Sequence, residues 1–327
     1  MMTPILLISL ALAANGAAEC RVTPQIIADL RDERITGSLE VAESEARRIL
    51  RCPDLEGDEH LALRLELAKT LDRVGLHTDT RPVAEALEIL RRAETEADPE
   101  DPSAQAKIAL ALAEYFYRAE MGDRQFPTAT TYARKAEALF REQGDPVGET
   151  EAVHRLGLIE LQRGNSLHAR ELFDRSLELS KHGPRRPIFL SDYHRHVGFV
   201  DLQSGDHVSA IEHFEKSLAY RNEAGSRDYG LFARSMLGSA LIDGGRPAEA
   251  RPYLEQAIEI AREIPSPVGG LRATYNLGKM YEALGETDAA LGHYRQAYET
   301  ATQLEVASIQ KAAHEGVTRL QVMESPE

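Results

Sequence analysis

The sequence has no tryptophan and only two cysteines, and aromatic residues make up 6% of its 327 positions. Its 38 lysines and arginines are outnumbered by 53 aspartates and glutamates, which gives a formal net charge of −15. Nucleic-acid binding depends on clustered basic side chains, so this balance argues against a nucleic-acid partner. Phosphate-binding loops, nucleophile elbows and HExxH motifs are also missing from the sequence. We therefore expect no catalytic residues and no cofactor.

Histidines are unevenly distributed, because seven of the eleven lie between residues 154 and 213. No two of these seven have the i,i+4 spacing with which a helix presents two ligands to zinc. His194 and His196 are two residues apart and face different sides of a helix. We expect packed or solvated histidines and no metal site.

The first eighteen residues carry no charge, and residues 5–14 form an apolar run. The run is too short to span a bilayer, and it precedes small residues at positions 16–18. This pattern predicts a signal peptide cleaved after Ala18 and a periplasmic or secreted protein. Two alternatives stay open. One is an uncleaved anchor or a lipoprotein acylated at Cys20, and the other is a misplaced start codon, which would leave the protein in the cytoplasm.

Small residues recur through the chain with a nearly constant period of 40 to 43 residues. The phased alanines are Ala46, Ala86, Ala129, Ala169, Ala210, Ala250 and Ala290. Four residues after each of them stand Leu50, Leu90, Ala133, Phe173, Phe214, Leu254 and Tyr294. A period of this size indicates a repeat architecture, in which each unit buries its apolar face only against its neighbours.

Two sets of glycines follow the same period in the second half of the sequence. Gly157, Gly198 and Gly238 lie inside expected helices, where each costs about 1 kcal/mol relative to alanine. We interpret them as points where two helices approach closely. The second set fits the left-handed position that ends a helix, and it consists of Gly164, Gly205, Gly245 and Gly285.

The motif Y-N-L-G-x-x-Y at residues 275–281, followed by A-x3-Y-x2-A at 290–297, resembles the tetratricopeptide repeat. The resemblance covers residues 22 to about 303, and it implies an all-α superhelical solenoid of seven helix–turn–helix repeats. The period of about 40 residues, rather than the family's usual 34, is similar to the longer repeats of kinesin light chains and of bacterial regulators such as the maltose activator. HEAT and armadillo arrays share the period but lack the phased glycines and alanines.

Each repeat is expected to contain two helices. The first helices are expected near 24–34, 58–75, 103–121, 147–163, 187–204, 228–243 and 267–284. The second helices are expected near 38–52, 81–97, 127–143, 167–182, 207–222, 247–264 and 287–303. A final helix near 305–323 has apolar residues at helical spacing. We expect it to cap the array and to cover Leu291, Tyr294 and Tyr298.

Both cysteines fall in the first repeat, with Cys20 before its first helix and Cys52 at the end of its second. In an antiparallel helix pair these two ends lie side by side, so we expect a disulfide that closes a 33-residue loop. Such a link would stabilise the terminal repeat by about 3–4 kcal/mol. Two unrelated buried thiols are the alternative. The predicted organisation is a signal peptide over 1–18, a repeat array over 19–303, and a capping helix with a polar tail over 304–327.

In the family that the sequence resembles, the first helices line a concave groove that binds a protein or a peptide. The groove positions implied for this sequence are Glu151, His154, Leu158, Gln162, Arg195, Phe199, Gln203, Ser235, Ser239, Asp243, Tyr275 and Lys279. Aromatic and arginine side chains among amides and hydroxyls suit an extended peptide or a helix. The predicted function is therefore that of a non-catalytic protein-interaction scaffold, with no membrane span in the mature chain. The alternatives are a small-ligand- or peptide-binding component of an envelope system and an intracellular sensor or regulator arm.

Overall fold

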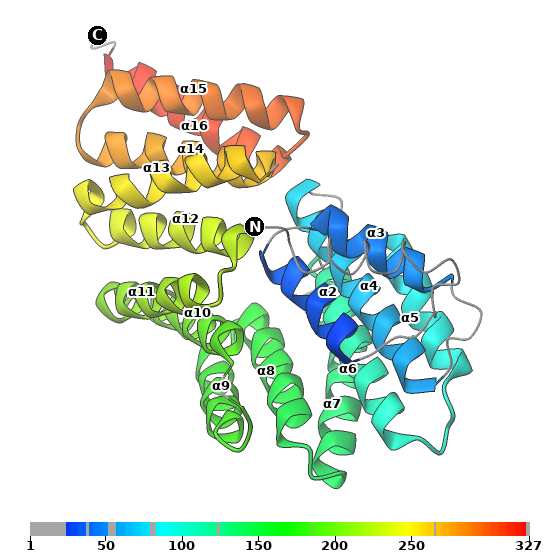
Figure 1. The fold of residues 1–327 in the computed structure, drawn as a ribbon. Helices are drawn as coiled ribbons and strands as arrows, with labels where there is room; N and C mark the ends of the chain where they lie inside the picture. The colour runs from blue at the N-terminus through cyan, green and yellow to red at the C-terminus, as the bar shows by residue number, and fades with distance from the viewer. Residues whose placement is uncertain are drawn as a thin grey trace. The chain divides into compact units, whose positions relative to one another are not determined.

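The computed structural model describes residues 24–36, 39–51, 57–78, 83–122, 125–184, 186–264 and 266–324, which form fifteen helices and no strand. In chain order the helices are α2 (Pro24–Thr36), α3 (Leu39–Ile49), α4 (Gly57–Thr78), α5 (Ala84–Glu96), α6 (Pro102–Ala119), α7 (Pro127–Glu142), α8 (Pro146–Arg163), α9 (Ser166–Ser180), α10 (Pro187–Ser204), α11 (His207–Glu223), α12 (Arg227–Asp243), α13 (Pro247–Glu263), α14 (Pro267–Ala283), α15 (Thr287–Gln303) and α16 (Ala307–Glu324) (Figure 1). Each expected helix is present with its ends shifted by a few residues at most. Within the described ranges, no helix has the length and apolar composition of a bilayer span.

Two sequence predictions fall outside the described ranges. The expected signal peptide lies before Pro24, and neither Cys20 nor Cys52 belongs to the described residues. The cleavage and the disulfide therefore stay predictions.

Packing divides the chain into two compact units whose boundary lies inside α8. The first unit comprises residues 1–75 and 81–155, and the second comprises 76–80 and 156–327. Within the first unit α6 packs on α7, and within the second α10 packs on α11, α12 on α13 and α14 on α15. We call the first helix of each pair the A helix and the second the B helix. Adjacent pairs also meet, for example α11 with α12 and α13 with α14. This packing of neighbours on neighbours confirms the predicted all-α repeat fold.

The phased residues form the interior of each pair. All seven phased alanines are at most 1% exposed. A β-carbon on Gly278 of α14 would lie 2.6 Å from the ring of Tyr294 on α15, so only glycine lets the A helix lie directly on that ring. The same close approach joins Gly157 to Phe173, Gly198 to Phe214 and Gly238 to Leu254. The second glycine set ends A helices with φ between 75° and 86°, as predicted for Gly164, Gly205, Gly245 and Gly285.

The turn between α6 and α7, where the period lengthens to 43 residues, is built differently. Phe126 adopts a left-handed φ of 46°, and its buried ring stacks on Tyr117 with centroids 5.6 Å apart. The carboxylate of Glu120 accepts hydrogen bonds of 3.1 Å from the backbone N–H groups of Thr128 and Ala129. A buried ring and a helix cap thus hold this longer turn in place.

Helix α16 covers the end of the second unit by packing on α14 and α15. Its Leu320 joins Leu291 and Tyr294 in one apolar cluster, so these two residues are covered as predicted. Tyr298 is a correction, because its side chain is 38% exposed. Its ring lies tilted against the ring of His314, with centroids 5.7 Å apart.

A cluster of hydrogen bonds joins the last three helices, α14, α15 and α16. The hydroxyl of Tyr294 donates to Glu282 Oε2 at 2.5 Å, and Arg319 Nε and Nη2 donate to the same carboxylate at 2.7 and 2.8 Å. Gly278 of α14 and Gly316 of α16 lie against opposite edges of the Tyr294 ring. One tyrosine therefore connects three consecutive helices.

Candidate functional site

The predicted partner-binding residues lie on A helices at a few recurring positions. Leu158, Phe199, Ser239 and Lys279 each directly follow the glycine that packs on the B helix, and the others lie one or two turns away along the helix. In the second unit α12 and α14 contact each other directly, so equivalent positions on these two helices are neighbours.

Three of the predicted residues are buried and offer a partner little surface. His154 is 7% exposed, Leu158 6% and Ser235 5%. At Ser235 the cause is the contact between A helices, since its backbone carbonyl accepts a 3.1 Å hydrogen bond from Asn276 Nδ2 of α14. For these three residues the expected position on an open surface is corrected.

Arg195 and Phe199 lie four residues apart on α10. Arg195 Nη2 donates to Asp192 Oδ1 at 3.1 Å, and Arg221 pairs with the same carboxylate. Arg195 Nε has no hydrogen-bond partner among the described residues. The half-buried ring of Phe199 packs edge-on against Phe214, with centroids 5.3 Å apart. Both side chains are thus anchored by their own repeat and retain some surface.

The remaining predicted residues are polar or aromatic and partly accessible. Lys279 Nζ pairs with Asp243 Oδ1 at 2.9 Å, and Ser239 Oγ donates to Asp243 Oδ2 at 3.5 Å. The half-buried ring of Tyr275 lies 5.7 Å from that of Tyr294. Gln162 and Gln203 are exposed, and Glu151, in the first unit, is half-buried. The structure therefore places most of the second unit's predicted residues where a bound chain could reach them.

Two of the clustered histidines form a contact in α10 and α11. His194 Nδ1 and His213 Nδ1 are 2.9 Å apart, and the His194 ring stacks on Tyr220. Burial, helped by the nearby His213 and Lys216, lowers the pKa of His194 to about 4. Burial also lowers the pKa of His213, so near neutral pH both rings are uncharged and one donates to the other. Within the described part of the chain, no three side chains converge as metal ligands would.

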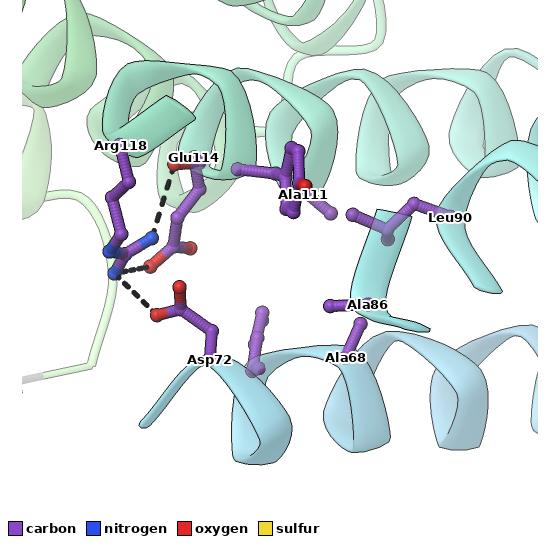
Figure 2. A pocket seen from close by; sticks show the side chains of 9 residues that line it. Ala68, Asp72, Ala86, Leu90, Ala111, Glu114 and Arg118 are labelled. Carbon is purple, nitrogen blue, oxygen red and sulfur yellow. Dashed lines mark hydrogen bonds and ion pairs between the residues drawn. The ribbon is translucent and has the colours of Figure 1, made fainter. Parts of the chain in front are cut away.

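A pocket lies in the first unit between α4, α5 and α6 (Figure 2). It is lined by Ala68, Lys69, Asp72, Ala86, Leu90, Ala111, Glu114, Tyr115 and Arg118. The space measures about 280 Å³ with its open mouth included. Four of these nine residues are alanine or leucine, and the four charged side chains come from α4 and α6.

Figure 2 shows the guanidinium of Arg118 between two carboxylates beside this pocket. Arg118 Nη2 lies 3.1 Å from Asp72 Oδ2 and 2.9 Å from Glu114 Oε1. Arg118 Nη1 also donates to the backbone carbonyl of Glu114 at 3.1 Å. The guanidinium is therefore held firmly by groups on two A helices.

The charge state of Glu114 is set by its neighbours. Burial would raise the pKa of this carboxyl, but the positive charges of Arg155, Arg118 and Lys69 outweigh burial and hold the pKa well below its usual range. Glu114 is consequently ionised at any physiological pH.

The comparisons with known proteins identify the repeat. The family model described as tetratricopeptide repeat matches residues 189–263 and 231–303. Residues 189–303 are tetratricopeptide repeats. Over these residues, the family that the sequence motif predicted is thereby confirmed. No curated protein matches the sequence.

Solved structures with tetratricopeptide-type folds align over most of the chain. The sensor-containing STAND (signal transduction ATPase with numerous domains) protein from Pyrococcus horikoshii has a TM-score of 0.66 and 16% identity, covering 99% of this chain and 48% of that one. Aspartyl phosphate phosphatase F from Bacillus subtilis has a TM-score of 0.57 and 14% identity, covering 90% and 79%. A Rap protein complexed with competence and sporulation factor has a TM-score of 0.52 and 13% identity, covering 91% and 97%. At these identities the likeness concerns the fold.

The partner-binding positions predicted from the sequence did not include the charged residues of α4 and α6. In α14 the glycine that packs on the B helix, Gly278, stands eleven positions after the first residue of the helix. The equivalent residues of α4 and α6 are alanines, Ala68 and Ala113. Lys69 and Glu114 directly follow these alanines, so they occupy the same repeat position as Phe199. A small residue followed by a charged one, in the middle of each A helix, was the signal that would have found them.

Proposed function

We propose that this protein is a non-catalytic interaction scaffold that binds an extended peptide or a helix along the A helices of its second unit, around Arg195 and Phe199. The matched tetratricopeptide repeats support a role in protein–protein interaction in general. The proposal adds a location and a kind of partner to that role.

The supporting observation is a contrast between adjacent positions on α10, α12 and α14. The packing position is glycine in all three helices, because a large side chain of the B helix fills the space. The next position holds Phe199, Ser239 and Lys279, three side chains with nothing in common. The fold requires glycine at the first position and places no such requirement on the second. We therefore attribute the choice of side chains at the second position to the binding of a ligand.

Two structural neighbours are described in terms of binding or sensing. The Rap protein is complexed with competence and sporulation factor, and the STAND protein carries a tetratricopeptide repeat sensor. A ligand-binding role is therefore compatible with this fold. We further propose that the protein is exported, on the basis of its uncharged, apolar first eighteen residues.

The test begins with a peptide that binds the full chain, selected from a displayed random library. Its affinity is then measured by fluorescence anisotropy for the wild type and for the double variant Arg195→Ala, Phe199→Ala. Aromatic and arginine side chains carry a large share of interface energy, so we expect a loss of at least about 2 kcal/mol, roughly thirtyfold in affinity.

A matched control replaces two exposed residues on the B helix of the same repeat, Glu212→Ala with Lys216→Ala, which should leave affinity unchanged. Because Phe199 packs on Phe214, Phe199→Leu is measured as well, with thermal melting of every variant. Full affinity in the double variant would contradict the proposal. So would a loss of affinity that appears only where the melting temperature has collapsed.

A further inference from the structure

Two side chains of the kind that binds metals meet between α10 and α11, at His194 and His213. Their Nδ1 atoms are 2.9 Å apart, so both nitrogens can reach the same ion. Each residue is only partly buried, which leaves the two rings some contact with solvent. The i,i+4 spacing that was applied to the sequence concerns histidines of one helix. It could not find a pair that forms across two helices.

The separation of the two nitrogens suits neighbouring ligands of one ion. Imidazole nitrogens lie about 2.0–2.1 Å from a bound zinc ion. With bonds of similar length, nitrogens 2.9 Å apart subtend an angle of about 90° at the metal. Tetrahedral zinc requires about 109°, whereas neighbouring ligands in square-planar or octahedral complexes are about 90° apart. Cu²⁺ and Ni²⁺ adopt these arrangements and bind imidazole well, so the geometry favours them over zinc.

A buried carboxylate beside His213 supports a ligand role for this histidine. Asp201 is 8% exposed, and its Oδ1 accepts a 3.0 Å hydrogen bond from Arg170 Nη1. Its Oδ2 has no hydrogen-bond partner among the described residues and lies 3.9 Å from His213 Nε2. A histidine that binds a metal through Nδ1 carries its proton on Nε2 and almost always donates it to a carboxylate, a carbonyl or water. Asp201 Oδ2 can accept that proton after a shift of about 1 Å.

Protons and nearby charges leave room for a cation. Burial lowers the pKa of both histidines, so near neutral pH a metal meets two uncharged rings. The proton between the two Nδ1 atoms moves to a ring Nε2 when both nitrogens bind. The charged side chains that act on His213 are two cations and two anions, namely Arg170, Lys216, Asp201 and Glu212. Lys216 also acts on His194, but it is exposed and its charge is screened by solvent.

We infer that His194 and His213 together bind one divalent transition-metal ion, Ni²⁺ or Cu²⁺, through their Nδ1 atoms, with water at the remaining positions and Asp201 orienting His213. Only two protein ligands take part, which agrees with the lack of three converging ligands in the described part of the chain. The inference is independent of the proposed peptide-binding surface, because neither histidine belongs to the predicted partner-binding residues.

The test uses the full chain without a histidine tag and with both cysteines alkylated, so that thiols do not compete for the metal. Titration calorimetry with NiCl₂ near neutral pH should show one site of micromolar affinity. His194→Gln and His213→Gln should each weaken this binding at least about tenfold, since even an indirect partner of a metal ligand contributes that much.

His293→Gln is the matched control. His293 of α15 occupies the same repeat position as His213, but its ring stacks on Tyr281 instead of meeting a second histidine. This variant should keep the wild-type affinity for Ni²⁺. Unchanged affinity in His194→Gln or His213→Gln would overturn the inference. An equal loss in His293→Gln, or no binding to the wild type at millimolar Ni²⁺, would overturn it as well.

Two further measurements keep the result separate from any effect on folding. Ni²⁺ should raise the melting temperature of the wild type and of His293→Gln but not of the two ligand variants. Electron paramagnetic resonance of the wild type with one equivalent of Cu²⁺ should show hyperfine splitting from two imidazole nitrogens. Splitting from a single nitrogen would contradict the site, even if a ligand variant failed to fold. No peptide is used, so failure here leaves the proposed scaffold function to its own test.

Discussion

The contact between Gly278 and Tyr294 makes a quantitative prediction about Gly278→Ala. In an exposed helix, replacing glycine by alanine stabilises by about 1 kcal/mol. Here the new β-carbon would lie 2.6 Å from Tyr294 Cδ1. The ring has nowhere to go, because Gly316 lies against its other edge and Glu282 binds its hydroxyl. Overpacking of a core typically costs about 1–3 kcal/mol, so the net effect is a destabilisation of up to about 2 kcal/mol.

Gly292→Ala is the matched control in the same helix pair. Gly292 is an exposed residue of α15, and a β-carbon there would meet nothing within 4 Å. We expect this variant to be stabilised by up to about 1 kcal/mol. The two glycine variants should thus differ by about 1–3 kcal/mol, or several degrees in melting temperature for a unit of this size.

Thermal and urea melts followed by far-UV circular dichroism measure this difference. A double-mutant cycle with Tyr294→Leu then tests the cause, since Gly278→Ala should become neutral or stabilising once the ring is gone. The reasoning is refuted if Gly278→Ala raises stability as much as Gly292→Ala does. It is also refuted if the effect of Gly278→Ala is the same with and without the tyrosine ring.

Three further outcomes are expected. Deleting residues 305–327 should expose the surface under α16 and cause aggregation with helicity largely kept, and a soluble monomer of unchanged stability by light scattering and circular dichroism would argue against a capping role. Burial lowers the pKa of His194 from 6.5 to about 4. Between these two pH values His194 is protonated in the unfolded chain but not in the folded chain, and this difference favours unfolding. Stability should therefore decrease from about pH 6.5 to 4, and melts of His194→Gln should show a smaller decrease. Intact-mass measurement of protein from its native compartment, with and without reductant, should give a chain that begins near Glu19 with Cys20 and Cys52 oxidised, whereas a full-length mass or two free thiols would exclude that prediction.

The helices and their internal packing were predictable because they depend on short-range signals. Glycines at fixed offsets mark both the end of an A helix and its contact with the B helix, as Gly205 and Gly198 do for α10 and α11. The period of about 40 residues therefore predicted both the ends of the helices and the contacts between the A and B helices. The α6–α7 turn was recognised only as a longer interval, since its cap relies on Glu120 reaching across the insertion to Thr128 and Ala129.

The surface was harder to predict because it depends on contacts between pairs. Ser235 has the sequence features of an accessible hydroxyl, yet the approach of Asn276 from the next A helix buries it. The pocket beside Arg118 escaped notice for a related reason. Its wall combines alanines from three helices, and nothing within any one helix indicates that a space remains between them.

The contacts of Tyr294 have a consequence for motion in the second unit. A terminal helix that packs on a single neighbour frays, and its amide protons exchange with solvent quickly. In α16, however, Arg319 binds the carboxylate of Glu282 on α14, and Tyr294 of α15 binds the same carboxylate. Detachment of α16 therefore breaks a contact in which α14 and α15 also take part. The last three helices should thus open together, and the amides in the middle of α16 should exchange at the rate of those in α14.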